Sequence, residues 1–392
     1  MAAIVYVVQL IHYLRSASAR SWLGLVLAVA IGAGVGTAAG VILRRSTGPV
    51  ALAPLPQPSI PASDLDRTDA AGHLDQPATP VTVSPAPTRR VPPTSVPSPV
   101  GTSPGTPAAG AAGRPGGTVR FAAAGDIACP ASSPDYVDGR GTRTTCRQQA
   151  TSDLLVGRGL DAVLALGDLQ YENGSADSFG QVYDPTWGRL RQITRPAIGN
   201  HEYNSGGGGY FDYFGAAAGP RDQGWYSFDL GAWHLVALNS NCDRVGCGPG
   251  SAQQQWLAAD LAAHPNRCTL AFWHHPRWSG GEHGDNPAVG PLVKTLYAAG
   301  ADLVLAGHDH DYERFAPLDP SGAADLGRGL RQFVVGSGGK SHYRVTPTRH
   351  TEAFTDDTFG VLELTLRPTG YDWSFRPEAG RTFTDHGSTP CH

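Results

Sequence analysis

Beyond residue 117 the sequence predicts an α/β fold, in which buried strands alternate with helices. Short apolar runs recur between segments of helical pattern, and they are continuous in hydrophobicity, as strands buried on both faces are. With 41% hydrophobic residues, 8 Trp, 13 Tyr and 12 Phe, a chain of 392 residues can fill a large core. Residues 331–377 add a region rich in strand-forming residues, and no internal repeat is present.

The apolar runs define six expected strands and the segments between them three expected helices. Strands are expected at 118–125, 160–167, 194–199, 233–239, 269–274 and 301–307. Helices are expected at 144–157, 251–264 and 286–299. The second helix begins at Ser251, a favourable N-cap, and carries Trp256, Leu257 and Leu261 on one face.

The first 117 residues have a different character. After an N-terminal segment, 1–21, residues 22–43 contain no charge and, at about 1.5 Å rise per residue, are long enough to cross a bilayer. We expect a membrane anchor, and a cleaved secretory signal is the alternative. Residues 46–117 hold 16 of the 32 prolines, so 44–117 is expected to be a disordered, semi-rigid linker.

The cysteines and the charges of the remaining domain, 118–392, indicate its compartment and limit the partners it can bind. All six cysteines lie in it, which is consistent with three disulfides in an oxidising, extracytoplasmic compartment, and Cys242 and Cys247 could pair across a short loop. The first 117 residues carry eight Arg and four Asp, which leaves 22 basic and 30 acidic residues beyond them. This acidic surplus argues against nucleic-acid binding by a basic face.

Polar residues directly follow five of the expected strands. They are Asp126, Asp168, the pair Asn200 and His201, His274, and the run His308, Asp309 and His310. Ligands bind at the carboxyl ends of strands in open α/β sheets, so these side chains are expected to converge on one rim. One such residue would be typical of an ordinary turn, but five strand endings in one chain indicate a site.

Carboxylate, amide and imidazole donors together suit two adjacent Zn, Fe or Mn ions. Calcium would require nearly all oxygen, and a structural zinc site would require thiolates. Two ions bridged by a carboxylate hold the attacking and departing oxygens of a displacement, and they lower the pKa of bound water to about 7, which supplies hydroxide. The predicted chemistry is phosphoester hydrolysis.

Five short motifs, in order, carry a resemblance to a known superfamily. They are GD at 125–126, GDLQY at 167–171, GNHE at 199–202, HHP at 274–276 and GHDH at 307–310. This ordered set resembles the calcineurin-like metallophosphoesterases over roughly residues 118–392. The resemblance implies a four-layer α/β/β/α sandwich of two mixed sheets, with a dinuclear metal site at the strand ends.

The first motif departs from the pattern of most members, which have Asp-x-His there. Here Ile127 and Ala128 follow Asp126, and one ligand is missing. Tyr171, three residues after Asp168, makes an Asp-x-x-Tyr pattern similar to the purple acid phosphatase branch, in which that tyrosine binds the first metal. A phenolate is a hard, anionic oxygen donor, so this exchange favours Fe(III).

Carried over by motif, the resemblance assigns every ligand of the two ions. Asp126, Tyr171 and His310 are ligands of the first ion, Asp168 is the bridge, and Asn200, His274 and His308 hold the second, a Zn, Mn or Fe(II) ion. His274 is preferred to His275 because the family pattern is His-x-Pro, and His275 is expected to be a packed or supporting residue.

Two more histidines are expected to act on the substrate. The resemblance makes His201 a phosphate-contacting or proton-donating residue, which requires reach to the leaving oxygen. His283, nine residues after His274 in a turn-rich segment, stands where the purple acid phosphatases place another substrate-contacting histidine. The alternatives are a loop-orienting His201 and a merely exposed His283.

Two glycine-rich segments are less informative. The GGKS of 338–341 lacks the first glycine of a phosphate loop, since residue 334 is Val, so it is not a nucleotide-binding motif of that kind. The run 205–215 is interpreted either as a substrate lid with Tyr210 and Tyr213 or as core aromatics beside a glycine turn.

The sequence therefore predicts a membrane-tethered, extracytoplasmic phosphomonoesterase of the purple acid type, acting on a phosphorylated small molecule or ester. A phosphodiesterase or nucleotide hydrolase on the same scaffold is the alternative enzyme. A non-catalytic, surface-displayed metal- or glycan-binding domain is the alternative of another class, which the presence of all seven ligand positions disfavours. The strand-end motifs do not name the substrate, because the pocket loops decide it.

Overall fold

The computed structural model describes residues 117–392. The expected segments 1–21 and 22–43, and all but the last residue of the linker 44–117, lie outside the described residues. None of the helices between residues 117 and 392 has the length and apolar character that a membrane crossing requires.

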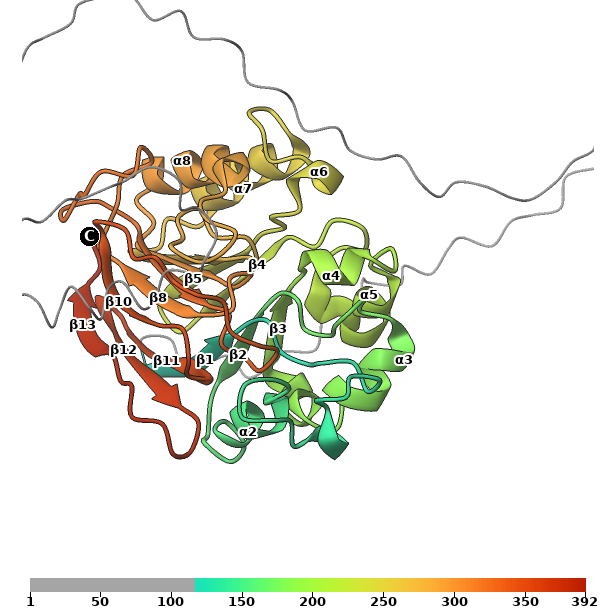
Figure 1. Cartoon of the computed structure of the whole chain (residues 1–392). Helices are drawn as coiled ribbons and strands as arrows, with labels where there is room; N and C mark the ends of the chain where they lie inside the picture. Colours follow the sequence, from blue (N-terminus) through green and yellow to red (C-terminus); the bar gives the residue numbers. More distant parts are fainter. Residues whose placement is uncertain (1–116) are drawn as a thin grey trace, which may run out of the picture. The chain divides into compact units, whose positions relative to one another are not determined.

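Two mixed β-sheets form the centre of the domain (Figure 1). The six-stranded sheet has the order β13-β12-β11-β1-β2-β3 and consists of His386–Pro390, Gly370–Pro377, Gly360–Arg367, Val119–Ala124, Ala162–Leu166 and Thr194–Ala197. The seven-stranded sheet has the order β10-β8-β9-β7-β6-β5-β4 and consists of Thr351–Thr355, Tyr312–Phe315, Arg331–Val335, Leu303–Ala306, Cys268–Phe272, Trp233–Ala237 and Tyr226–Leu230.

Alternate side chains of the seven-stranded sheet pack into two different hydrophobic cores, one on each face of the sheet. Leu235 and Ala237 of β5 belong to the cluster that contains Phe121 of β1, so this face packs against the six-stranded sheet. Val236, between them, belongs to a second cluster that contains Leu257. Because side chains of a strand point to opposite faces in turn, a continuous apolar run buries both faces of the sheet.

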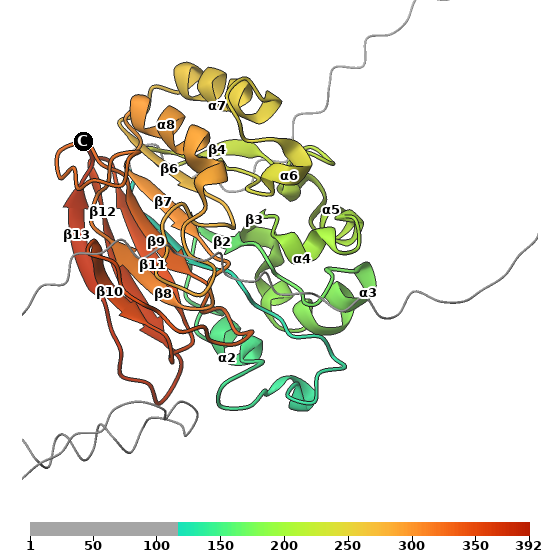
Figure 2. The same cartoon turned by 45° about the horizontal axis from the view of Figure 1, so that its top comes forward.

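Helices cover the outer faces of the two sheets (Figure 2). On the seven-stranded sheet lie α7 (Ala252–Ala263), α8 (Gly290–Ala298) and the short η5 (Pro287–Val289), near α6 (Cys242–Val245). On the other sheet, η3 (Trp187–Ile193) packs against β2, and α2 (Gln148–Asp153) packs against η3. Trp187 Nε1 donates to Thr151 Oγ1 at 3.2 Å. The resulting order of layers is helix, sheet, sheet, helix.

Short helices fill the connections near β3 and before β2. They are η1 (Val137–Gly139), α3 (Ala176–Ser178), η2 (Phe179–Tyr183), α4 (Asn200–Tyr203), α5 (Gly208–Phe214) and η4 (Gly215–Ala218). Tyr210 of α5 is fully buried, and its hydroxyl donates to the carbonyl of Pro196 at 3.0 Å. Tyr213 packs against the ring of Phe179. Tyr210 is therefore a core residue and Tyr213 packs against the core, which favours the interpretation as core aromatics beside a glycine turn.

All six expected strands form, and the strand-rich region 331–377 holds four more, β9 to β12. Three further strands, β4, β8 and β13, were missed. The hairpin partner β4 is only half-buried, so it lacks the continuous apolar run of a central strand. The helix expected at 144–157 is confined to α2, because Cys146 has a left-handed backbone (φ 59) that a helix cannot include. Ser251 caps α7 by accepting from the Gln254 amide at 3.3 Å, as predicted.

Three disulfides tie the described residues together, and they use all six cysteines. The pairs are Cys129–Cys146, Cys242–Cys247 and Cys268–Cys391. The predicted short-loop pair Cys242–Cys247 is confirmed. The third pair joins the start of β6 to the C-terminal end of the chain, which fixes the last strand, β13, to the seven-stranded sheet.

Candidate metal centre

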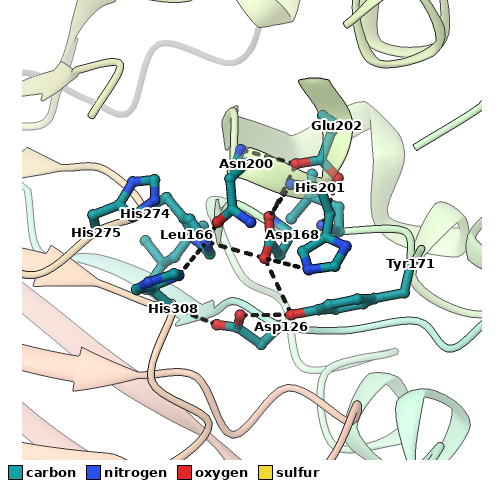
Figure 3. A network of polar contacts seen from close by, with 12 residues as sticks. Asp126, Leu166, Asp168, Tyr171, Asn200, His201, Glu202, His274, His275 and His308 are labelled. Atoms are coloured by element: carbon teal, nitrogen blue, oxygen red, sulfur yellow. Dashed lines mark hydrogen bonds and ion pairs between the residues drawn. The ribbon is translucent and has the colours of Figure 1, made fainter. Parts of the chain in front are cut away.

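Five strand endings deliver polar side chains to one place, as the sequence predicts (Figure 3). Asp126 follows β1, Asp168 follows β2, Asn200 follows β3, His274 follows β6 and His308 follows β7. Asp126, Asp168 and His308 have positive φ angles of 58°, 50° and 75°. Such backbone conformations are costly for residues other than glycine and concentrate at functional sites.

The glycines before these residues leave room for the polar side chains. A Cβ on Gly167, which has φ +83°, would lie 2.6 Å from Nδ1 of His274. A Cβ on Gly307 would lie 2.7 Å from Oδ2 of Asp126. The motifs therefore need glycine before the Asp or His, because any larger residue would collide with a neighbouring side chain of the site.

Asp168 stands at the centre of the arrangement. Its Oδ2 lies 3.2 Å from the hydroxyl of Tyr171 and 3.1 Å from Nε2 of His274. Its Oδ1 accepts the backbone N–H of His201 at 2.9 Å. One oxygen therefore faces two groups of side chains, which is the position that a bridging ligand occupies.

The first group, which we call the tyrosine side, consists of Asp126, Tyr171 and His310. The hydroxyl of Tyr171 donates to Oδ1 of Asp126 at 2.8 Å and lies 2.9 Å from Nε2 of His310. That nitrogen lies 3.3 Å from the same Asp126 oxygen. Three side chains from three separate segments thus point their donor atoms at one position.

The second group, which we call the histidine side, consists of Asn200, His274 and His308. Nε2 of His274 lies 3.1 Å from Oδ1 of Asn200 and 3.2 Å from Nδ1 of His308. The other ring nitrogen, Nδ1 of His274, lies 2.9 Å from the carbonyl of Leu166, which accepts its proton and leaves Nε2 as the donor atom toward the site.

The donor set fits metal cations. Asp126 and Asp168 are almost completely buried, yet between residues 117 and 392 neither carboxylate forms an ion pair with Lys or Arg. Their ion-pair partners in this part of the chain are histidines alone. Because a metal-bound imidazole is neutral, a bound cation would supply the positive charge that these buried carboxylates need. Donor atoms of Asp126, Asp168 and His274 lie within 4.8 Å of one another, as do those of His274, His275 and His308.

The protonation of the metal-free site shows how closely these groups interact. Burial opposes ionisation of Asp168, but His274 and His201 outweigh it and hold its pKa well below the usual range. Burial lowers the pKa of His274, and the Asp168 carboxylate overcomes this and raises it to about 9. Burial and the nearby Asp126 raise the pKa of Tyr171 far above its ordinary value, so this residue is a phenol in the absence of a cation.

The side chains of His201 and His283 are both partly exposed to solvent beside the site. Nδ1 of His201 lies 2.8 Å from the carbonyl of Glu172, which leaves Nε2 free, 3.9 Å from Oδ2 of Asp168. Nδ1 of His283 lies 2.9 Å from Oδ1 of Asp309, and its ring centroid is 4.2 Å from that of His308. The two imidazoles approach from the tyrosine side and the histidine side, respectively.

His275 lies behind the histidine side. Its Nδ1 is 2.8 Å from Oγ of Ser240, and its ring centroid is 4.3 Å from that of His308. Burial and the neighbouring His274 lower its pKa to about 3, so it stays neutral. Unlike His274, it forms no hydrogen bond or ion pair with Asp168 within the described residues, which agrees with a supporting role.

Sequence reasoning missed Glu202, the last residue of the GNHE motif. It is fully buried, and its carboxylate accepts the backbone N–H groups of Asp168 at 3.0 Å, Leu169 at 2.9 Å and Gly199 at 2.8 Å. It therefore holds two of the strand-end loops in register. Its place inside a recognised motif was the available signal, but only the fold reveals that it bonds to backbone rather than to a metal.

Comparisons with known proteins agree with this geometry. Residues 119–312 match the family model of the calcineurin-like phosphoesterases. Among curated proteins, the chain is 29% identical over 187 residues to probable purple acid phosphatase 20 of Arabidopsis thaliana, covering 40% of each chain. It is 31% identical over 211 residues to purple acid phosphatase 21 of the same plant, covering 48% of this chain and 46% of that one. The matches thus span less than half of these relatives.

Among solved structures, the fold is similar to that of the purple acid phosphatase PPD1 from yellow lupin seeds. The TM-score is 0.58 at 20% identity, and the match covers 71% of this chain and 55% of the lupin chain. At this identity the likeness bears on the fold alone, and it agrees with two mixed sheets enclosed by helices.

Proposed function

Residues 119–312 form a calcineurin-like phosphoesterase domain of the purple acid phosphatase-like branch, and we propose that the protein is a metal-dependent phosphatase that hydrolyses phosphomonoesters at a dinuclear centre. One observation carries the proposal. Six of the seven side chains that the sequence selects form two groups of three. One oxygen of Asp168, the seventh, contacts Tyr171 in one group and His274 in the other.

The two groups differ in the charge they can offer a cation. The tyrosine side has two oxygen donors that become anionic, Asp126 and Tyr171, and suits Fe(III). The histidine side has only neutral donors besides the shared Asp168, and it suits Zn, Mn or Fe(II). When bound, the two ions would lower the pKa of a water molecule and neutralise charge on the phosphate.

The residues of the chain would orient the ester and donate the proton that the leaving group needs. His201 is held by two contacts, its backbone N–H to Asp168 and its Nδ1 to the Glu172 carbonyl. Nε2 is then directed to the substrate, where it donates a proton to the leaving oxygen. His283, oriented by Asp309, would contact a phosphate oxygen from the opposite side.

The location and tethering of the enzyme are further parts of the proposal. Three disulfides support an oxidising, extracytoplasmic compartment. Residues 22–43 would anchor the chain in the membrane, and the linker would hold the catalytic domain away from the surface.

The test is metal analysis and visible spectroscopy of the full chain and of its Tyr171→Phe variant. We expect two metal ions per chain and a tyrosinate-to-iron absorption band that the variant lacks. A colourless protein with two zinc or manganese ions would contradict the Fe(III) assignment.

Turnover of p-nitrophenyl phosphate against bis(p-nitrophenyl) phosphate then separates the candidate activities. Preference for the monoester supports the proposal, and preference for the diester favours a phosphodiesterase on the same scaffold. Binding of metal without hydrolysis of either compound would favour a non-catalytic domain.

A further inference from the structure

The GGKS segment, which is not a phosphate loop, lies beside the tyrosine side of the site. It follows β9, and its backbone is bonded to two neighbouring segments. The amide of Gly338 donates to the carbonyl of Gly125 at 3.0 Å, and that of Lys340 donates to the carbonyl of Asp126 at 2.9 Å. The amide of Cys146, in the disulfide with Cys129, donates to the carbonyl of Lys340 at 3.1 Å. The segment is thus fixed along the end of β1.

Ser341 of this segment and Tyr343, two residues beyond it, hold His310. Oγ of Ser341 lies 2.7 Å from Nδ1 of His310, and the ring of Tyr343 stacks on the imidazole at a centroid distance of 4.0 Å and an angle of 9°. Because the Ser341 hydroxyl can accept the Nδ1 proton, Nε2 keeps its lone pair toward Asp126 and Tyr171. A hydrogen bond on the remote nitrogen is the usual way in which proteins orient a histidine ligand.

The third side chain, Lys340, lies over Tyr171. Its ammonium is 4.4 Å from the centroid of the phenol ring and forms an ion pair with the carboxylate of Glu172. The side chain of Lys340 is 19% exposed and that of Glu172 is 58% exposed. A cation at this distance from an aromatic face interacts with the electrons of the ring, and partial burial strengthens the interaction.

The composition of the chain makes this lysine unusual. The sequence contains 28 arginines and only two lysines, Lys294 and Lys340. Lys294 lies exposed on α8, on the outer helix layer. A compact ammonium can sit over one ring as a point charge, whereas a planar guanidinium of five donors would demand more space and more acceptors.

We infer that Lys340 is a positioning residue whose charge lowers the energy of the filled ring orbitals of Tyr171 when this residue binds a metal. Ser341 and Tyr343 orient His310 beside it. The inference rests on the proposed function, because it requires a metal-bound tyrosinate. The ammonium lies close to the phenolate ring, which donates the electron in a tyrosinate-to-iron transition. Its positive charge stabilises the filled orbitals of the ring and moves the absorption band to shorter wavelength.

The experiment compares the visible band and the metal content of the full chain with those of three variants. Lys340→Met keeps the length of the side chain without the charge, and we expect its band at longer wavelength with two metal ions retained. Glu172→Gln removes the compensating charge from an exposed position, and we expect a shift to shorter wavelength. Lys294→Met removes the other lysine, and we expect the wild-type band.

Opposite shifts in Lys340→Met and Glu172→Gln would support the inference, since a general loosening of the site would move both in the same direction. An unchanged band in both variants would overturn it while leaving the proposed function intact. If Lys340→Met does not fold, the band of Glu172→Gln alone tests the inference: a shift to shorter wavelength supports it, and an unchanged band overturns it. A wild-type protein without the band would overturn the iron assignment itself, which is a different and recognisable result.

Discussion

The tyrosine side and the histidine side of the site share one oxygen of Asp168 but are built differently. The histidine side consists of neutral donors at the ends of strands, and each is placed by the sheet. On the tyrosine side only Asp126 ends a strand. Tyr171 and His310 stand three and two residues beyond Asp168 and His308, and the 338–343 segment supports them. One half of the site is therefore set by the sheet, and the other half is set by loops.

The largest effect should come from the residue that the two sides share. Asp168→Asn keeps the shape but removes the bridging charge, so we expect loss of both ions. Metal-based charge stabilisation contributes several kcal/mol, so activity should fall on the order of 10³-fold or more. Metal analysis beside kcat/KM checks this, and a variant that keeps two ions would show that Asp168 is not the bridge.

Removal of His201 should separate catalysis from metal binding. His201→Asn leaves the backbone N–H bond to Asp168 in place, so both ions should stay, while the loss of a proton donor should lower kcat by about 10²-fold or more. The decrease should be smaller for an aryl phosphate, whose leaving group needs no proton, than for an alkyl phosphate. Equal decreases for the two esters would indicate that His201 only orients its loop.

The disulfide Cys129–Cys146 offers a way to weaken one side alone. The Cys129→Ala/Cys146→Ala variant frees the segment that bonds to Lys340, and we expect a loss of about 10-fold or more in affinity for the first ion. With a separation of 17 residues, the stability of the fold should also fall by about 3 kcal/mol.

Cys242→Ala/Cys247→Ala is the matched control, since that pair lies away from the tyrosine side. Stepwise release of the ions to a chelator, followed through the visible band, distinguishes the two variants. If both variants lose the first ion equally readily, the loop that contains Cys146 does not support the tyrosine side.

The smallest effect is expected at His283, which lies beside the histidine side. Its side chain is 43% exposed and contributes one contact at most to a phosphate oxygen, about 1 kcal/mol or roughly fivefold. His283→Ala should therefore raise KM with little change in kcat. An unchanged KM for every ester tested would assign the residue to the exposed surface.

The sequence alone determined most of the site. Apolar runs that end in Gly-Asp, Gly-Asn or Gly-His are local signals, because strand burial and the need for a small residue at a crowded turn both act over a few positions. They were sufficient to select the seven side chains that the structure brings together. The preference for His274 over His275 as a ligand stays a prediction, since donor atoms of both lie within 4.8 Å of His308.

Tertiary structure decided what depends on residues far apart in the chain. Glu202 bonds to backbone 34 positions away, and Lys340 lies over a ring 169 positions before it. Neither contact leaves a trace in local hydrophobicity, because each is made by one polar atom and depends on how two loops are placed. The half-buried strand β4 was missed for the same reason, since its pairing with β5, rather than its composition, makes it a strand.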